Sequence, residues 1–489
     1  MGREIKMFGG FAKTSSRIAI AAALGVTLGG YAMSTPAKAG GLGGDCCADL
    51  EERVAELEAT TVRKGNKKVS VTISGWVIKA VNVWDDGDIS SVYVADKSYD
   101  LGSRFAITGS ATIAPGWSAG YNLTVNTFGN QFGVAGTGAA SNQFNEGGGA
   151  AFGAISTLYS YMYIKSDNYG TINWGLLSPA SDNAAVLADI SGTVIESNAV
   201  WFEGASFFLR PTGAAGGLAG LSPLTAGFFT QCTGLAAGGA GIGADCWGAA
   251  NPSIRYDTPT FGGFRVETSF GTNQLTGPAF GFTTPKSQFW DIAAFYNDDW
   301  GNFKVSAAYS YTWIELAVAT GNRGDLHQVG ATVMHSPSGI GLYGLYQNES
   351  STGAPNTDVW YLKPFVKSNW NSAGATIFYG EYGQYNDQYA SLVGVDQCAL
   401  GSFGAGTNAA AFCGGNIANT LAVTGSEIER YGLGVVQEID TAAMHLFARW
   451  QHQDADIDFT GINAAGVSSG VNQGFDEWDL FQFGGIIFF

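Results

Sequence analysis

The side chains that most often perform catalysis or bind metals are scarce and scattered in this sequence. Its 489 residues include four histidines, and these lie at His327, His335, His445 and His452. Their spacing fits neither a metal site nor the order of a catalytic triad. No pair of carboxylates stands out as a catalytic acid and base. We therefore expect no enzymatic activity, no metal site and no bound cofactor.

Four cysteines form two local pairs. Cys232 and Cys246 lie 14 residues apart, and Cys398 and Cys413 lie 15 apart, each pair within glycine- and alanine-rich sequence. Metal binding is one interpretation, but histidine and acidic ligands do not cluster there. Cysteines of exported proteins pair in an oxidising compartment, and each bond would restrict a glycine-rich loop. The spacing therefore favours two disulfides in loops.

Composition indicates an unusual outer surface. Charged residues make up only 13% of the chain, about half the share of a typical soluble domain, and the net charge is −17. An acidic chain binds nucleic acid poorly, because phosphate contacts need basic side chains. Aromatic residues reach 13%, and glycine accounts for 71 residues. No run after residue 40 approaches the roughly 18 apolar residues of a membrane helix. These features predict a β-rich protein whose outer surface need not face water.

The first 39 residues have the features of an export signal. Basic residues precede a short apolar stretch at 18–28, and Ala37-Lys38-Ala39 has the small-residue pattern of a cleavage site. We predict a cleaved signal peptide over residues 1–39.

A short amphipathic helix is expected in the next segment, residues 40–68. Leu50, Val54 and Leu57 have helical spacing, with acidic residues between them. Two interpretations stay open: a small coiled coil that joins copies of the chain, or an isolated periplasmic helix that packs on its own body.

The remaining chain, 69–489, is built from alternating strands. Residues 69–83 alternate between apolar and polar side chains, and so do 105–113 and 117–125 around the turn Ala114-Pro115-Gly116. Similar strand pairs flank six further turns, at 167–170, 258–263, 297–302, 335–339, 368–372 and 438–441. With one strand before these seven hairpins and one near 476–489 after them, the pattern predicts sixteen strands. Alternation is poor at 158–166, 340–348 and 374–383.

This layout predicts an all-β fold, a 16-stranded antiparallel transmembrane β-barrel. Short turns at one end, long loops at the other and an even number of strands are typical of such barrels. The polar faces carry Ser, Thr, Asn and Gly, rather than the many charges of a soluble sandwich. Sixteen strands enclose a cylinder too wide for side chains to fill, so we expect water inside.

Several segments resemble the alphaproteobacterial general porin family. They are GDCCADLEERVAELEATT (44–61), RKGNKKVSVTISGWV after it, YIKSDNYGTINWGLLSPASDNAAVLAD (163–189) and RYDTPTFGGFRVETSFG (255–271). The resemblance implies an outer-membrane barrel, usually a homotrimer, that passes ions and small hydrophilic solutes by passive diffusion. It implies lipid and lipopolysaccharide around the barrel, and one loop folded into the pore. A substrate-specific channel is the alternative, and it would show a lane of aromatic residues or a dense basic ladder in the lumen.

The C-terminus also resembles an outer-membrane assembly signal, which the assembly machinery would read. Its elements here are Gln482, Gly484, Ile487 and the terminal Phe489.

Parity assigns charged residues to the pore. The basic residues expected on the lumen side of the wall are Arg104, Arg255, Arg265, Lys304, Lys363, Lys367, Arg430 and Arg449. A charge facing lipid at mid-membrane would cost about 2–4 kcal/mol, which agrees with this assignment. By the resemblance, the loop within about 178–250 narrows the pore and carries Asp182, Asp189 and Glu196. We expect these acids to face the basic wall across a gap, so that both remain hydrated and set ion preference.

Overall fold

The computed structural model describes fourteen stretches of the chain. They are residues 68–97, 102–128, 143, 154–197, 204, 207–212, 224–226, 229, 250–272, 288–315, 323–351, 356–388, 420–462 and 468–489. The expected signal peptide (1–39) and helix within 40–68 lie outside the described residues, except for Lys68.

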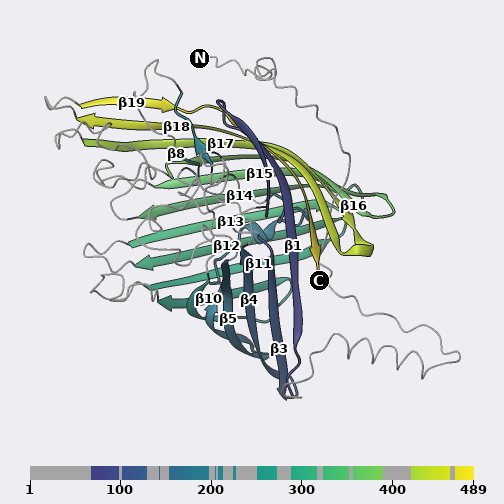
Figure 1. Ribbon diagram of the computed structural model, residues 1–489. Helices are drawn as coiled ribbons and strands as arrows, with labels where there is room; N and C mark the ends of the chain where they lie inside the picture. Colours follow the sequence, from purple (N-terminus) through teal and green to yellow (C-terminus); the bar gives the residue numbers. More distant parts are fainter. Residues whose placement is uncertain are drawn as a thin grey trace.

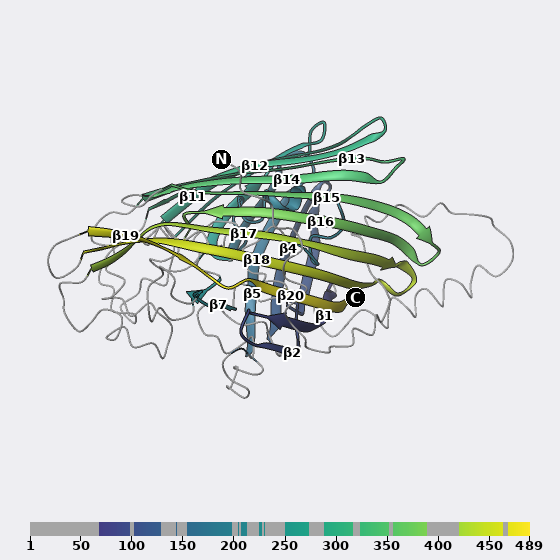
Figure 2. The same ribbon diagram turned by 90° about the horizontal axis from the view of Figure 1, so that it is seen from above.

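The strands form one closed antiparallel barrel with sixteen positions around its wall (Figures 1 and 2). Its strands are β1 (Thr72–Asp85), β3 (Arg104–Ala114), β4 (Trp117–Phe128), β5 (Ala154–Ser166), β6 (Gly170–Leu177), β9 (Asn251–Asp257), β10 (Phe264–Thr272), β11 (Gln288–Trp300), β12 (Phe303–Glu315), β13 (Arg323–His335), β14 (Ile340–Ser351), β15 (Thr357–Asn371), β16 (Gly374–Asn386), β17 (Thr420–Ile439), β18 (Met444–Ile462) and β20 (Trp478–Phe488). The barrel closes where β1 pairs with β20, in a register that sets Trp76 opposite Phe488. Closure leaves no sheet edge exposed to lipid.

All seven predicted hairpins are confirmed, because each predicted turn separates two paired strands. The turn before β14 shows why glycine is needed there. Gly339 has φ +69°, and a Cβ atom on it would lie 1.8 Å from the carbonyl oxygen of Lys367. Only glycine combines this backbone conformation with so close an approach.

Two short strands that the sequence did not predict extend the wall. β2 (Ser90–Ala95) pairs with residues 80–85 of β1, whereas β3 pairs with residues 72–76 of the same strand. In the same way, β19 (Ser468–Gly474) pairs with residues 456–462 of β18, and β20 pairs with residues 444–453. Between β2 and β3 the chain leaves the sheet, and Asp96 there forms an ion pair with Lys79 on the outward face of β1. A third pair, β7 (Phe208–Leu209) and β8 (Leu224–Thr225), forms a separate small sheet.

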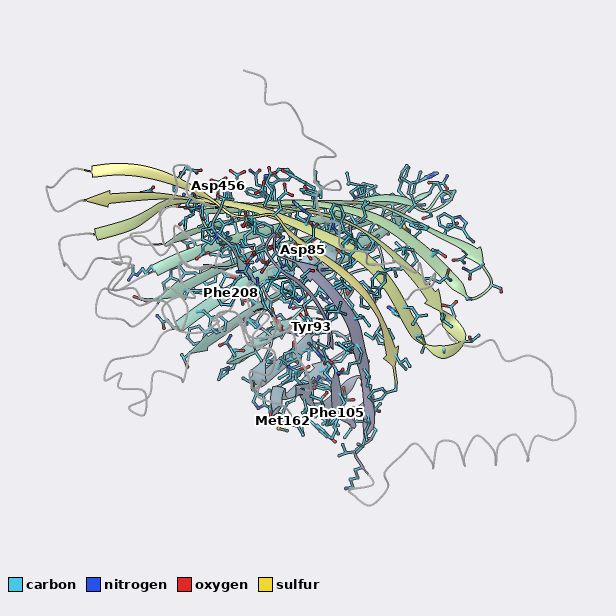
Figure 3. The ribbon with its side chains drawn as sticks, turned by 45° about the horizontal axis from the view of Figure 1, so that its top comes forward. Asp85, Tyr93, Phe105, Met162, Phe208 and Asp456 are labelled. Atoms are coloured by element: carbon cyan, nitrogen blue, oxygen red, sulfur yellow. The ribbon has the colours of Figure 1, made fainter. Side chains whose placement is uncertain are left out.

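The outer surface has the two aromatic girdles of a membrane barrel. On β11, Trp290 and Trp300 lie ten residues apart and are 41% and 57% exposed; on β15, Trp360 and Trp370 have the same spacing. Ten residues span about 33 Å along a strand, or about 25 Å across the membrane when the strand tilts by about 40°. This height matches the apolar band of an outer-membrane barrel. Between the girdles most outward side chains are apolar, as at Met162 (Figure 3).

Part of the barrel interior is filled by an apolar cluster. Residues of the chain after β6, such as Phe207 and Phe229, pack with the inward side chains Trp84, Trp478 and Leu480. This cluster occupies part of the cross-section of the lumen, which the sequence did not predict. Among the described residues, no helix is long and apolar enough to cross a membrane.

Candidate functional site: the pore lumen

Strand alternation places the predicted basic side chains on the inner face of the wall. On β15, Lys363 is fully buried, whereas its neighbour Leu362 is 43% exposed and faces outward. On β17, Arg430 is buried beside the outward Tyr431. The ladders place the other predicted wall residues on the same inner parity, namely Arg104, Arg255, Arg265, Lys304, Lys367 and Arg449.

Residues 178–197 fold into the barrel and run along its inner wall; we call them the inner loop. Near its start, the backbone N–H and hydroxyl of Ser181 donate to Asp291 on β11 at 2.8 and 2.7 Å. Further on, Ala188 accepts from Thr332 on β13 at 2.7 Å. At its end, the inner loop contacts β16 and β18. The loop therefore lies against one side of the lumen, from β10 to β18.

Asp189 of the inner loop forms a buried ion pair with the wall. The Nζ of Lys363 donates to Asp189 Oδ2 at 2.7 Å and to Thr193 Oγ1 at 3.2 Å, and it also contacts the carbonyl oxygen of Ser197. The side chains of Lys363 and Asp189 are 0% and 2% exposed. The expectation that loop acids and wall bases stay apart and hydrated is wrong for this pair, because the loop packs directly on β15.

A second buried ion pair involves a wall acid that was not predicted from the sequence. Glu381 on β16 accepts from Arg430 at 3.1 Å and from the hydroxyl of Tyr361 at 2.6 Å, and Ser197 of the inner loop also donates to it. Arg430 and Glu381 are both 1% exposed. Arg430 is thus neutralised by the wall itself, and the inner loop docks onto the pair.

Glu196 ties the end of the inner loop to β18. Its Oε1 lies 2.7 Å from Nδ1 of His445, and its backbone oxygen accepts from Arg449 at 2.9 Å. Lys97, from the segment between β2 and β3, is buried and interacts with this group of charges. Asp189 therefore forms an ion pair with a base of the wall, and Glu196 forms hydrogen bonds to the wall, instead of facing it across a gap.

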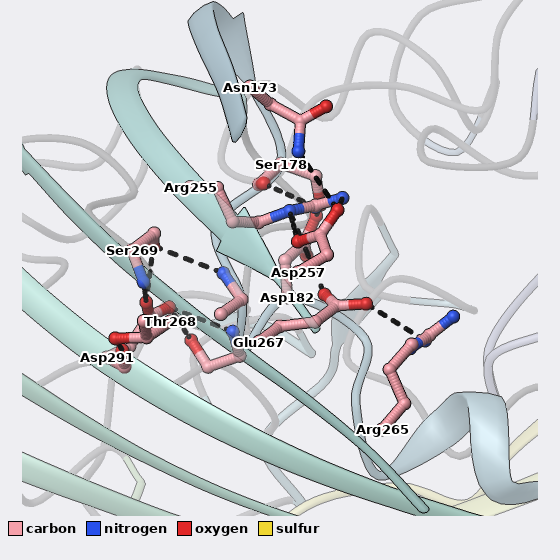
Figure 4. Close-up of polar contacts among 12 residues, drawn as sticks. Asn173, Ser178, Asp182, Arg255, Asp257, Arg265, Glu267, Thr268, Ser269 and Asp291 are labelled. Carbon is pink, nitrogen blue, oxygen red and sulfur yellow. Dashed lines mark hydrogen bonds and ion pairs between the residues drawn. The ribbon is translucent and has the colours of Figure 1, made fainter. Parts of the chain in front are cut away.

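A second charged cluster lies where β6, β9 and β10 meet (Figure 4). Arg255 Nε lies 2.8 Å from Asp257 Oδ1, and its NH1 donates to the carbonyl oxygen of Ser178 at 2.9 Å. Arg265 NH2 lies 2.9 Å from Glu267 Oε1. The arginines here are thus paired with carboxylates of their own strands, and Arg255 also fixes the start of the inner loop.

Asp182 forms hydrogen bonds within its own loop. Its carboxylate accepts from the hydroxyl of Ser178 and, at 2.8 Å, from Nδ2 of Asn183. The residue is 5% exposed. Asp182, Asp189 and Glu196 thus all lie on the loop inside the barrel, but Asp182 is not in the group around Lys363 and Glu381.

Three predicted wall residues lie away from these clusters. Lys304 is the second residue of β12, opposite Asp299, and is exposed at the end of the barrel that carries the short turns. Lys367 lies near the same end of β15, and its Nζ is 2.7 Å from Glu438 Oε1. The guanidinium of Arg104 lies 4.8 Å from the centre of the Trp76 ring.

At the outer mouth, a separate group of hydrogen bonds connects segments that are distant in the sequence. Asp86, after β1, accepts from Gln143 Nε2 and, at 2.8 Å, from Nε of Arg210. The backbone oxygen of Arg210 in turn accepts from the N–H of Asp476 at 2.7 Å. Burial raises the pKa of the Asp476 carboxyl, and the negative charge of Asp86 adds to the effect. Segment 207–212 is thereby fixed over β1 and β20.

The C-terminal residues have distinct positions on β20 and at its end. Gln482 faces inward and donates to Asn82 Oδ1 at 2.7 Å, and Ile487 faces outward. A Cβ atom on Gly484 would lie 2.4 Å from the Phe447 ring. Phe489 is 59% exposed, and its N–H and C=O bond to Gly75 at 3.0 and 2.9 Å.

The remaining expectations concern the predicted disulfides and metal binding. Cys232, Cys246, Cys398 and Cys413 lie outside the described residues, so the disulfides stay predictions. Within the described part of the chain, no group of three or more His, Cys, Asp or Glu residues could hold a metal ion.

Fold and site together define a transmembrane β-barrel channel with a loop folded into its lumen. Residues 18–401 match the Gram-negative porin family, and the chain belongs to this family. It is therefore a porin of the outer membrane, as the sequence predicted, and it forms a general outer-membrane pore. The narrower alphaproteobacterial group stays an inference from resemblance.

The chain also matches solved structures of outer-membrane proteins. The anion-selective porin from Comamonas acidovorans is 18% identical, and the match covers 86% of this chain and all of that one with a TM-score of 0.52. OmpT of Vibrio cholerae in its trimer form is 11% identical over 86% of this chain and 100% of that one, with a TM-score of 0.45. OmpF of Salmonella typhi, in complex with daunomycin, is 11% identical over 86% and 99%, with a TM-score of 0.43. A search of curated protein sequences found no match.

Proposed function

We propose that this porin passes ions and small hydrophilic solutes by passive diffusion through a path that the inner loop narrows. The observation that carries the proposal is the attachment of residues 178–197 inside the closed barrel. Hydrogen bonds and ion pairs connect this segment to β10, β11, β13, β15, β16 and β18. A segment held at so many points narrows the lumen permanently, because it does not leave the wall without exposing buried charges.

The solute path then lies on the other side of the lumen. In a closed barrel, β3, β4 and β5 face the wall that carries the inner loop. Their inward side chains are polar or aromatic, as at Ser118, Asn122 and Tyr161, and most are partly exposed. A partly exposed polar wall opposite a fixed loop suits the passage of hydrated solutes.

Ion preference in this proposal depends on the charge that is not cancelled within ion pairs. At the inner loop, the bases Lys97, Lys363, Arg430 and Arg449 meet the acids Asp189, Glu196 and Glu381. Because Lys363 with Asp189 and Arg430 with Glu381 cancel within contact pairs, we expect weak ion selectivity and not the strong field of separated charge rows. Asp182, Asp189 and Glu196 remain our constriction residues, and the eight wall bases line the lumen above, at and below them.

The assembled protein, in our proposal, is a homotrimer surrounded by outer-membrane lipid and lipopolysaccharide, and it is delivered by the outer-membrane assembly machinery. The exposed apolar band between the aromatic girdles supports the lipid contact. The family and fold point to a channel, and we propose that the chain has no catalytic activity and needs no cofactor.

Planar-bilayer recording of the purified protein tests the function. We expect stepwise conductance that rises in proportion to salt concentration, with steps in groups of three if trimers insert. A matched preparation that was heat-denatured before addition serves as the control. Absence of conductance steps above this control would contradict the pore.

A further inference from the structure

The inner face of β5 carries three tyrosines in succession, Tyr159, Tyr161 and Tyr163, which we call the tyrosine row. The register places them opposite the inward positions Thr124, Asn122 and Gly120 of β4. The outward positions between them include Met162, which is 54% exposed to the lipid side. Three aromatic rings thus stand where the lumen of a diffusion pore needs only small polar side chains.

The rings lie along the wall, and those of Tyr159 and Tyr161 meet edge to face at an interplanar angle of 73°. A Cβ atom on Gly120 would lie 2.3 Å from both Cζ and the hydroxyl oxygen of Tyr163, so this ring covers the glycine of the neighbouring strand. The rings of Tyr159 and Tyr161 have centroids 6.5 Å apart. Asn122 Nδ2 donates to the hydroxyl of Tyr161 at 3.4 Å, and Asn122 accepts from Thr124 at 2.7 Å. Hydrogen-bonding groups therefore border the ring faces.

Exposure separates this row from the other inward tyrosines. Tyr343 and Tyr361 are 1% and 0% exposed, and their hydroxyls donate to Ala185 of the inner loop and to Glu381. These rings form the core between loop and wall. The tyrosine row, in contrast, is only partly buried and lies on the wall opposite the inner loop. A solute that moves past the inner loop must therefore move along the row.

The groups beside the row can bind the hydroxyls of a sugar. Arg255 is held by Asp257 at 2.8 Å, with Glu267 3.8 Å away. Lys165, the next inward residue of β5 after Tyr163, is an exposed cation that can donate hydrogen bonds to hydroxyl oxygens. An aromatic face bordered by amide and hydroxyl groups matches the apolar ring face and hydroxyl edge of a sugar.

We propose that the tyrosine row is a binding lane for neutral oligosaccharides, and that the pore favours such solutes over others of equal size. This proposal rests on the diffusion pore proposed above. Alternate residues on a strand are roughly 7 Å apart, so a linear chain of two or three sugar rings spans the row. Successive weak stacking contacts would hold the sugar briefly without trapping it.

Partial block of the ion current by maltotriose tests the lane. We expect wild-type conductance to fall in a saturable manner as maltotriose is added. Tyr161→Leu and Tyr163→Leu, measured separately, should each weaken sugar binding and so raise the half-saturating concentration by about five- to tenfold. Tyr161→Phe keeps the ring and should stay within about threefold of wild type. Tyr121→Leu, on the outward face of β4, is the matched control and should leave the block unchanged.

A polyethylene glycol of the same hydrodynamic size reports simple volume exclusion. If it reduces the current as maltotriose does, without saturation, and the leucine variants do not differ from wild type, the lane does not exist. Conductance without sugar is recorded in every case, so that a normal pore without saturable block overturns the lane alone. A wild-type protein without any conductance would instead contradict the pore.

Discussion

Lys363 and Asp189, which are 174 residues apart in the sequence, form an ion pair of 2.7 Å inside the barrel with almost no solvent exposure. The pair joins β15 to the inner loop and is supported by Thr193. Removing one member of a buried pair leaves an uncompensated charge, and this costs far more than removing both. The pair therefore determines how firmly the loop is held.

We first predict the effect of breaking this pair. Asp189→Asn should weaken the docking of the inner loop by about 3–5 kcal/mol, because the Lys363 ammonium remains buried without a countercharge. Thermal unfolding in detergent should begin at lower temperature, and single-channel current should become noisier. Asp189→Leu combined with Lys363→Met should recover more than half of the loss.

The control for this prediction is an exposed pair on the same barrel. Arg323 and Glu315 lie 3.1 Å apart and are 63% and 29% exposed. Arg323→Gln should cost far less stability than Asp189→Asn, because water already screens the pair. Equal effects of Arg323→Gln and Asp189→Asn would show that the Lys363–Asp189 contact does not hold the loop.

A second prediction concerns ion preference. Asp182→Asn removes a negative charge from the lumen, so selectivity should move toward anions. We expect less than about a twofold change in the cation/anion ratio, since Ser178 and Asn183 already satisfy the carboxylate. The shift should be larger in 0.01 M salt, where the Debye length is about 30 Å.

Reversal potentials across a salt gradient provide the measurement. Asp298→Asn, at the exposed end of β11, is the control and should have a smaller effect. A ratio that does not change at low salt would place Asp182 away from the solute path.

A third prediction tests the tight turn before β14. Gly339→Ala should lower the free energy of unfolding by more than about 1 kcal/mol, because the new Cβ meets the carbonyl oxygen of Lys367 at 1.8 Å. Gly301→Ala is the matched control, since Gly301 also has a positive φ, +62°, but no atom within 4 Å of the added Cβ. Unfolding in urea should therefore separate the two variants, and equal destabilisation would mean that φ alone matters.

Strand positions could be predicted from the sequence because lipid and lumen impose a period of two on every strand. Alternation failed where aromatic or apolar side chains face inward. On β5 the inward residues are Tyr159, Tyr161 and Tyr163, and on β14 they include Tyr343 and Leu345. Inward and outward faces then look alike in the sequence, although the short turns still fix the hairpins.

The contacts of the inner loop could not be predicted in the same way. Parity shows that Lys363 faces the lumen, but it does not show which loop residue lies on it. Glu381 was missed because a single inward carboxylate on a strand with poor alternation has no distinguishing pattern. Its partner Arg430 is on the adjacent strand, two residues from Gly432, which lies directly opposite Glu381. Trp84 and Leu480 are inward and apolar because the chain after β6 covers them.

A fourth prediction concerns the cysteines. Cys232–Cys246 and Cys398–Cys413 should be disulfide-bonded, because the chain is exported to the outer membrane and each pair is local. Peptide mapping without reductant should recover each pair as one linked peptide, and reduction should separate them. Free thiols at these four positions in freshly purified protein would contradict the prediction.

The last prediction concerns assembly and isolates the terminal ring from the backbone. Phe489 is 59% exposed on the outside of the barrel, and its backbone closes the wall through two hydrogen bonds to Gly75. Phe489→Ser keeps these bonds and removes only the ring. If the terminal aromatic residue is part of the assembly signal, the outer-membrane level of this variant should fall several-fold while export across the inner membrane continues. Phe483→Ser is the matched control, because Phe483 faces outward on the same strand and is 43% exposed. Quantitative blotting of outer-membrane and periplasmic fractions should show unassembled chain only for Phe489→Ser. Equal levels of the two variants would mean that the ring contributes general contact with lipid and no signal.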